Sequence, residues 1–207
     1  NENTSTRNFK VTGTSAGVTL LNVNSGHEHE SYRMAFLLEV GIGGTSTCIS
    51  ISGGAEVDAT LCEFGGDADN NSGTRRAVLA TGSGSQAYLE YSIIDFIEES
   101  QNGGLFGIVT ASSGEVELIS CDVLVERDTS QASGGSVTGM TVGAGCRAIM
   151  KNSTVATRVT TSGGTNTSTA LSNSGGAIAF STLFEGTVPA GEFYNSDTDQ
   201  LAYSQCS

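Results

Sequence analysis

Tryptophan is absent from this chain of 207 residues, proline occurs only once, at Pro189, and charged residues make up only 15%. Disordered chains are typically rich in charge and proline, so this composition argues against disorder. The longest apolar candidate, residues 34–40, has the length of a strand and is far shorter than the roughly 20 residues that cross a bilayer. We therefore expect an ordered protein without membrane insertion.

Basic residues are also scarce. Nine Lys and Arg stand against 22 Asp and Glu, which gives a net charge of −13. A surface of this sign repels phosphate backbones and anionic lipids, so nucleic-acid binding is disfavoured. Cations, neutral sugars and other proteins remain compatible partners. The five cysteines form no CxxC motif and their number is odd, so we interpret them as small apolar residues and not as a disulfide framework.

Glycine, serine and threonine are abundant, which favours many tight turns between short strands. Five segments align on one pattern, and their first residues lie 32, 29, 32 and 29 positions apart. These segments are residues 55–64, 87–96, 116–125, 148–157 and 177–186.

The aligned columns predict which side chains point inward. Two apolar columns lie two residues apart, as expected for a strand with one buried face. The first column holds Ala55, Ala87, Val116, Ala148 and Ala177, and the third holds Val57, Leu89, Leu118, Met150 and Ala179. A later column of small residues predicts a sharp corner between two strands: Thr60, Ser92, Cys121, Ser153 and Thr182.

A further apolar strand precedes each of the later segments, for example at residues 77–80 and 106–109. Short Gly/Ser turns follow it and longer polar loops precede it. The pattern predicts an all-β fold, a single-stranded right-handed parallel β-helix of about five to six rungs of about 30 residues. We expect one domain in three parts: an irregular N-terminal cap over residues 1–54, the repeats over 55–187, and a C-terminal cap or tail over 188–207.

These columns resemble the right-handed β-helices of the pectin-lyase-like superfamily. Within that superfamily, the small-residue-rich, Gly-turned style is similar to fibre and tailspike modules of viruses and phages. The resemblance covers about residues 50–187 and is architectural, so it implies the fold. It carries no catalytic motif, because β-helices of this kind host lyases, hydrolases, adhesins and inert shafts alike.

Four carboxylates are candidates for a site. In the alignment, Asp58 and Glu90 share one outward column, and Glu63 and Asp95 share another. Stacked like charges raise each other's proton affinity and favour a bound cation, so these residues could hold Ca²⁺ or form the acid and base of a glycan-cleaving enzyme. The alternative, favoured by the overall charge, is a solvated acidic face with no special role.

Other side chains suggest binding. On a strand, His27 and His29 would point the same way and could bind a transition metal, although the sequence identifies no third ligand; the alternative is a solvated loop. Tyr88, Tyr91 and Phe180 are candidates for stacking on surface glycans. Outward apolar residues on a fibre module more often lie in a subunit contact, so we rank a homo-oligomer, favouring a trimer, above sugar binding.

We therefore interpret the chain as a non-enzymatic structural or receptor-binding module of a virion fibre, a tailspike or a similar extracellular appendage. No resident cofactor is expected, with Ca²⁺ as the one candidate ion. The first alternative is a carbohydrate-active β-helix, a polysaccharide hydrolase or lyase. The second is a cell-surface adhesin or filament subunit.

Overall fold

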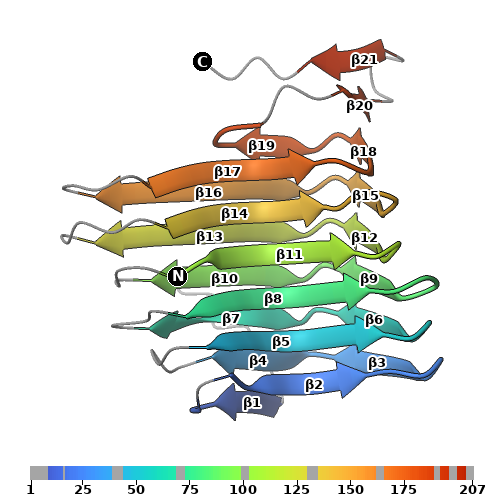
Figure 1. Ribbon diagram of the computed structural model, residues 1–207, viewed down its shortest axis with the longest axis vertical. Helices are drawn as coiled ribbons and strands as arrows, with labels where there is room; N and C mark the ends of the chain where they lie inside the picture. The colour runs from blue at the N-terminus through green and yellow to red at the C-terminus, as the bar shows by residue number, and fades with distance from the viewer. Residues whose placement is uncertain are drawn as a thin grey trace.

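The computed structural model describes residues 9–15, 17–38, 44–68, 73–98, 103–129, 135–161, 166–188, 192–195 and 200–203. Its strands form three sheets that wrap around one core, with successive rungs stacked along the long axis (Figure 1). Sheet A contains β1 (Phe9–Gly13), β4 (Met34–Leu38), β7 (Glu63–Ala68), β10 (Ile93–Glu98), β13 (Asp122–Thr129), β16 (Thr154–Thr161) and β19 (Leu183–Glu185). Sheet B contains β2 (Thr19–Val23), β5 (Thr45–Ser52), β8 (Thr74–Thr81), β11 (Leu105–Ala111), β14 (Gly135–Val142) and β17 (Asn166–Asn173).

Sheet C contains β3 (Glu28–Tyr32), β6 (Glu56–Thr60), β9 (Gln86–Glu90), β12 (Glu115–Ile119), β15 (Arg147–Lys151), β18 (Gly176–Phe180), β20 (Glu192–Asn195) and β21 (Gln200–Tyr203). The chain visits sheets A, B and C in that order and makes five full turns between β1 and β16, which lie in the same sheet. The fold is the expected right-handed parallel β-helix. Among the described residues there is no helix, and hence none that could cross a membrane.

Strand alternation places apolar side chains inside the helix. In sheet C, Ala87, Val116, Ala148 and Ala177 stack directly on one another, and each is buried. In sheet A, Phe64 stacks on Phe36 with ring centroids 5.5 Å apart. Because like residues repeat at each rung, the core is a set of short ladders, as the two apolar columns predict.

The corner between sheets C and A is built from left-handed backbone. One residue in each rung has φ between +45° and +56°, and none of them is glycine: Arg33, Leu61, Tyr91, Ser120, Asn152 and Ser181. The N–H groups of the first five donate to carbonyls of the next rung; Ser120 N–H, for example, lies 2.8 Å from Lys151 O. This conformation turns the chain while the interstrand hydrogen bonds continue.

In the four central rungs the residue after the left-handed position points inward and is small. Cys62, Ser92, Cys121 and Ser153 are all buried. The Cys62 N–H donates to Ser92 Oγ at 3.0 Å, and the Cys121 N–H donates to Ser153 Oγ at 3.1 Å. The serine hydroxyls therefore accept hydrogen bonds from backbone N–H groups that lie at the corner, outside the regular interstrand hydrogen bonding.

The register corrects the first aligned segment. Ala87 pairs with Val57 and not with Ala55, and Glu90 pairs with Thr60. The alignment of residues 55–64 is therefore displaced by two residues, and the corner column contains Cys62 in place of Thr60. A displacement of two residues keeps every side chain on the same side of the sheet, so the pattern of apolar residues does not reveal the displacement.

The ladder also extends further toward the N-terminus than expected. β1 pairs with β4, β2 with β5, and β3 with β6, all in parallel. The expectation of an irregular cap over residues 1–54 is wrong for the described part of that range; residues 1–8, 16 and 39–43 lie outside it. The first strands are more polar than the later rungs, and β3 carries His29 where later rungs carry Val57 and Ala87, so they matched no apolar column.

The C-terminal end closes differently. β20 pairs in parallel with β18, and β21 then runs antiparallel to β20. The change of direction ends the parallel ladder of sheet C. The other residues expected in the tail over 188–207, at 189–191, 196–199 and 204–207, lie outside the described part of the chain.

Four cysteines behave as the sequence predicts. Cys48, Cys62, Cys121 and Cys146 are buried free thiols, and Cys206 lies outside the described residues. Burial raises the pKa of the Cys48 thiol to about 12, and its Sγ donates to Phe36 O at 3.2 Å. A thiol held neutral in this way is a packing group.

We expect Ser153→Ala to destabilise the fold by about 1–3 kcal/mol, because the buried Cys121 N–H loses its acceptor. Ser172→Ala is the matched control, because Ser172 lies half-buried on the outward side of sheet B; we expect about 0.5 kcal/mol or less there. Chemical denaturation measures both values. Equal losses in the two variants would contradict a specific role of the corner hydroxyl.

We expect Ser120→Gly to stabilise the protein by about 1 kcal/mol, because glycine adopts the left-handed conformation without a Cβ clash. Ser50→Gly, in the strand β5, is the control and should destabilise by about 0.5–1 kcal/mol. Chemical denaturation measures the free energy of unfolding of both variants. A loss of stability in Ser120→Gly would show that the corner imposes no backbone strain.

Candidate functional site

The outward side of sheet C carries the densest set of polar side chains. Six strands, β3, β6, β9, β12, β15 and β18, each contribute five residues, of which the first, third and fifth point outward. The pairing keeps these positions in three straight columns along the helix axis. We call this surface the sheet C face.

The N-terminal half of this face is acidic. Glu28 pairs with Glu56, and Glu30 pairs with Asp58, so carboxylates stack on carboxylates at the rung spacing of about 4.8 Å. A hollow of about 650 Å³ lies over this region. It is lined by Glu30, Ser31, Tyr32, Glu56, Asp58, Thr60, Tyr88 and Glu90.

This stacking shifts the protonation of the carboxyl groups. Partial burial raises the pKa of Asp58, and the charges of Glu30, Glu28 and Glu90 raise it further. The pKa of Glu56 is raised in the same direction by burial and then by Asp58 and Glu28. The hollow therefore concentrates negative charge and favours cationic or hydrogen-bond-donating ligands.

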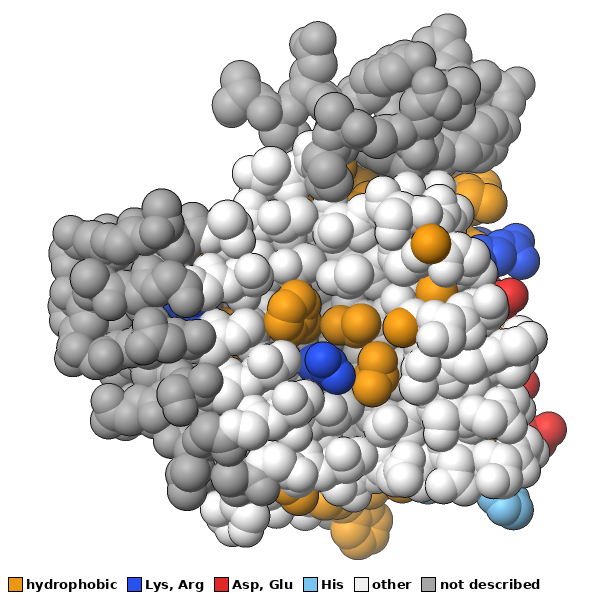
Figure 2. All heavy atoms as spheres, in the orientation of Figure 1, with side chains coloured by type: hydrophobic (Ala, Val, Ile, Leu, Met, Phe, Trp, Pro, Cys, Tyr) orange, Lys and Arg blue, Asp and Glu red, His pale blue; other side chains and the backbone are white. Residues whose placement is uncertain are grey.

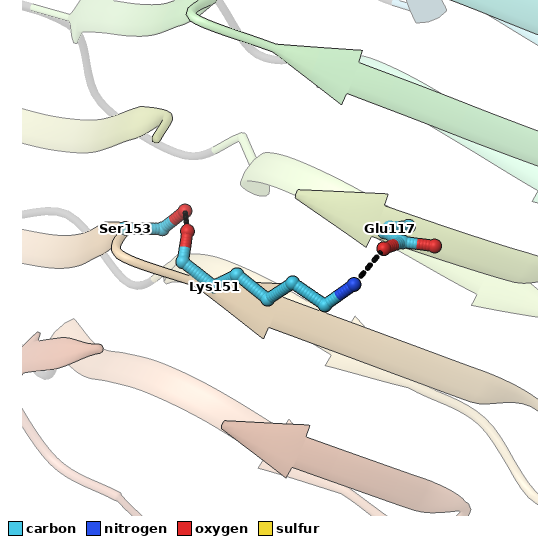
Figure 3. A network of polar contacts seen from close by, with 3 residues as sticks. All are labelled: Glu117, Lys151 and Ser153. Atoms are coloured by element: carbon cyan, nitrogen blue, oxygen red, sulfur yellow. Dashed lines mark hydrogen bonds and ion pairs between the residues drawn. The ribbon is translucent and has the colours of Figure 1, made fainter. Parts of the chain in front are cut away.

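The C-terminal half of the face carries charges of both signs, with Glu115 and Glu117 on β12 beside two cations on β15. Arg147 and Lys151 are its cations, and Lys151 Nζ lies 2.5 Å from Glu117 Oε1 of the preceding rung (Figure 3). Half-buried apolar side chains surround them: Ile119, Ile149, Ile178 and Phe180. The face thus changes from acidic to apolar with mixed charge along the axis.

The structure separates the four candidate carboxylates. Asp58 pairs with Tyr88 and Glu90 with Thr60, so the two acids line the same hollow but occupy different columns. Glu63 and Asp95 lie on sheet A, where Ile93 pairs with Glu63 and Asp95 with Gly65. The two expected column pairs, Asp58 with Glu90 and Glu63 with Asp95, are therefore wrong, because both depended on the two-residue shift.

On sheet A, Asp95 is nevertheless an unusual carboxylate. Its Oδ1 is buried and has no hydrogen-bond partner among the described residues. Burial raises the pKa of Asp95, and the charges of Glu63 and Glu126 add to the effect. We therefore interpret it as a desolvated surface acid.

The candidate binding residues lie apart. Tyr88 belongs to the acidic hollow, where its hydroxyl donates to Gln86 Oε1 at 2.9 Å. Tyr91 is 57% exposed at the corner after β9. Phe180 lies three rungs from Glu90 in the same column, which is about 14 Å away. The three aromatic residues do not form a single sugar-stacking platform.

The two histidines lie at the first rung of sheet C. His27 is exposed in the turn before β3, and His29 is half-buried with Nε2 at 2.9 Å from Ser31 Oγ. Within the described part of the chain, no group of three or more His, Cys, Asp or Glu side chains is arranged to hold a metal ion. The transition-metal site therefore remains a prediction without a third ligand, and we derive no chemistry from it.

Three acids of the sheet C face were missed by sequence reasoning: Glu30 and Glu56, which line the hollow, and Glu28 beside it. Their signal is present, because the pattern acid-x-acid at 28–30 repeats at 56–58. The irregular N-terminal region expected from the sequence includes residues 28–30, so this 28-residue repeat lies outside the five aligned segments. Comparison with family models, curated proteins and solved structures gives no match for this chain.

We expect Asp58→Asn to raise the melting temperature by about 2 °C at pH 7, because it removes repulsion in the stack. A carboxyl whose pKa is raised in the folded state binds its proton more tightly there than in the unfolded chain. Its ionised form therefore lowers the free energy of unfolding as the pH rises through the raised pKa, and this loss vanishes below the pKa of the unfolded chain. The gain should therefore disappear as the pH falls toward the ordinary pKa of an unfolded aspartate, about 3.9.

Asp122→Asn is the control for this substitution. It removes the same charge from sheet A, where Asp122 pairs with the uncharged Ile93 and Thr154. We expect a smaller rise in melting temperature for this variant at pH 7. Equal rises would attribute the effect to net charge instead of the local stack.

Proposed function

We propose that this chain is a rigid, non-enzymatic structural or receptor-binding module of an extracellular appendage such as a virion fibre or tailspike. The observation that carries the proposal is the unbroken register of three parallel sheets over five turns. Every rung is tied to its neighbours by backbone hydrogen bonds on three sides, which gives a stiff body suited to bearing load and displaying a surface.

The outward apolar side chains support association of copies. Ile149 stacks on Ile178, and Lys151 on Phe180, so the apolar group at the C-terminal half of the sheet C face is continuous. A continuous outward apolar group on a soluble body is typical of a subunit contact. We propose a homo-oligomer through this face, with a trimer as the arrangement expected from the sequence.

The hollow of the sheet C face is the proposed receptor-contacting surface. Tyr32 and Tyr88 offer aromatic surface beside the carboxylates of Asp58 and Glu90. Carboxylates accept hydrogen bonds from sugar hydroxyls, and aromatic rings pack on sugar rings, so surface glycans are the ligand class we propose.

The same hollow favours one alternative, a carbohydrate-active β-helix. Several carboxylates line it, and the raised pKa of Asp58 is a property that a general acid requires. In this alternative Asp58 and Glu90 are the acid and base candidates.

A combined glycan-binding and turnover screen separates the two functions. We expect the purified protein to retain glycans without shortening them, with or without Ca²⁺, and Tyr88→Ala to lower retention at least about tenfold. Tyr91→Ala is the matched control outside the hollow and should bind like the native chain. Chain shortening that is lost in Asp58→Asn would overturn the proposal in favour of the enzyme.

A further inference from the structure

Sheet B carries almost no charge on its outward side. Among the described residues of its strands, the charged residues are Arg75 and Arg76, and Arg75 is buried. Arg76 points outward, with Phe106 beside it in the next rung and with Leu79 and Val109 in the neighbouring outward column. Figure 2 views this side of the molecule and shows apolar side chains gathered around one cation near the centre of the face. The Nε atom of Arg76 is buried and has no hydrogen-bond partner among the described residues.

Sheet A has the complementary arrangement around Asp95, whose buried Oδ1 also has no hydrogen-bond partner in the described part of the chain. Asp95 lies between Ile93 and Ile97, which are 39% and 40% exposed, and Leu124 is its neighbour in the next rung. The described outward charges of this sheet are mostly acidic: Glu63, Asp95, Asp122, Glu126, Asp128 and Glu185, against Lys10 and Arg158. A desolvated carboxylate in an apolar setting on one face therefore matches a desolvated guanidinium nitrogen in an apolar setting on another.

We infer that copies of this chain associate side by side and in parallel, with sheet A of one copy against sheet B of the next and Asp95 paired with Arg76 across the contact. This contact goes beyond the proposed function, because it uses other faces than sheet C and leaves the hollow open. Each copy offers sheet A to one neighbour and sheet B to another, so the contact is heterologous and can close into a ring. A ring of three is the trimer expected from the sequence.

The rise of the helix brings the two side chains to nearly the same level. The chain passes from β8 through β9 and β10 to β11, so β10 lies between β8 and β11 along the axis (Figure 1). In a neighbour placed at the same height, Arg76 is therefore within one rung spacing, about 4.8 Å, of the level of Asp95. The contact needs no displacement along the axis, as a closed ring of equivalent copies requires.

The positions along the strands agree as well. The strands of sheet A end, and those of sheet B begin, at the corner between these two sheets. Asp95 lies three residues before the last residue of β10, and Arg76 lies two residues after the first residue of β8. These positions are about 10 Å and about 7 Å from the corner. When the corners of two copies lie side by side, Asp95 faces Arg76, and Ile93 faces Leu79 at an equal distance from the corner.

The other acids of sheet A meet no carboxylate across this contact, because the described strands of sheet B contain none. Glu185 is paired with Arg158 of its own sheet at 3.7 Å. Lys10 in the first rung and Asp128 at the corner lie at the edges of the contact. Three acids each have a hydroxyl donor on an adjacent rung within one residue of the same distance from the corner: Glu63 has Ser50, Asp122 has Thr141, and Glu126 has Ser136.

The burial of both atoms in the single chain favours their pairing. An ion pair in an apolar setting usually gains little, because each charge must first be removed from water. Asp95 Oδ1 and Arg76 Nε are already buried before the copies meet. Part of the desolvation cost is therefore present in the single chain, and the hydrogen bond formed between copies contributes to association.

A charge-reversal cycle tests the contact. We would measure the mass of the full chain by sedimentation at several concentrations for Asp95→Arg, for Arg76→Asp and for the double variant that carries both substitutions. Each single variant opposes two like charges at every contact, so the dissociation constant of the oligomer should rise at least about tenfold. The double variant restores an opposite pair at every contact, so it should recover most of the native association.

Glu28→Arg is the matched control. It makes the same charge reversal at an exposed position of β3 in sheet C, outside the inferred contact, and it should associate like the native chain. Melting temperatures show whether each variant is folded before its mass is interpreted. Where a reversal unfolds the chain, Asp95→Asn and Arg76→Gln replace it. Each of these should weaken association, and their combination should weaken it no further than one alone.

The outcomes distinguish this inference from the proposed function. Weaker association in the single variants and recovery in the double variant support the pairing of sheet A with sheet B. A native chain that associates while the single variants associate equally well, or while the double variant does not recover, overturns the pairing and leaves the association proposed for the sheet C face standing. A native chain that is monomeric at every concentration overturns both, and glycan retention by that monomer would leave only the receptor-binding role.

Discussion

The hydrogen bonding between successive rungs is the constraint on which the rest of this protein depends. Each strand pairs in parallel with the strand one turn earlier and one turn later, so position in the rung is conserved along the axis. A side chain therefore has nearly the same neighbours above and below. Apolar residues gain from this arrangement because they form continuous buried ladders such as Ala87, Val116 and Ala148. Charged residues are destabilised by this arrangement when the residues above and below them carry a charge of the same sign.

The corner between sheets C and A shows how the constraint selects side chains. The chain must turn there without losing the hydrogen bonds of the ladder, and in the first five rungs the left-handed residue achieves this by donating its N–H to the next rung. The residue that follows points into the narrow interior, so it is Cys or Ser in the central rungs. Ser92 and Ser153 add hydroxyl acceptors for the N–H groups of Cys62 and Cys121. Local conformation and packing therefore support the same turn.

Much of the fold could be predicted from the sequence because repetition is visible in it. The fold class, the inward columns and the corner followed from regular spacing of small and apolar residues. The exact register of the first segment did not follow, because a shift of two residues leaves Val57 and Ala59 pointing inward as before. The first rungs were missed for another reason: His29 stands where the later rungs have apolar residues.

The candidate site was predictable only in part. Asp58, Glu90 and Tyr88 were recognised as outward residues, and the structure places them around one hollow. Glu63 and Asp95 belong to another face, since the corner at Leu61 and Tyr91 separates sheet C from sheet A. A sequence column gives the side of a strand but not which residues of two strands lie opposite each other. That information resides in the interstrand register, and a displacement of about 7 Å along the strand changes which charges meet.

The in-register stacking of rungs also determines the energetics of the acidic half of the sheet C face. Glu28 on Glu56 and Glu30 on Asp58 are arrangements that a stacked ladder makes unfavourable. Burial raises the pKa values of Glu56 and Asp58, and the neighbouring carboxylate charges raise them further. The ion pair of Lys151 with Glu117 of the preceding rung shows that neighbouring rungs can also bring opposite charges together. The stability of the single chain therefore does not favour the stacked carboxylates of β3 and β6. A ligand that supplies positive charge or hydrogen-bond donors to these carboxylates offsets their repulsion. On this reasoning the repulsion within the rungs and the ligand affinity proposed for the hollow are two consequences of one in-register arrangement.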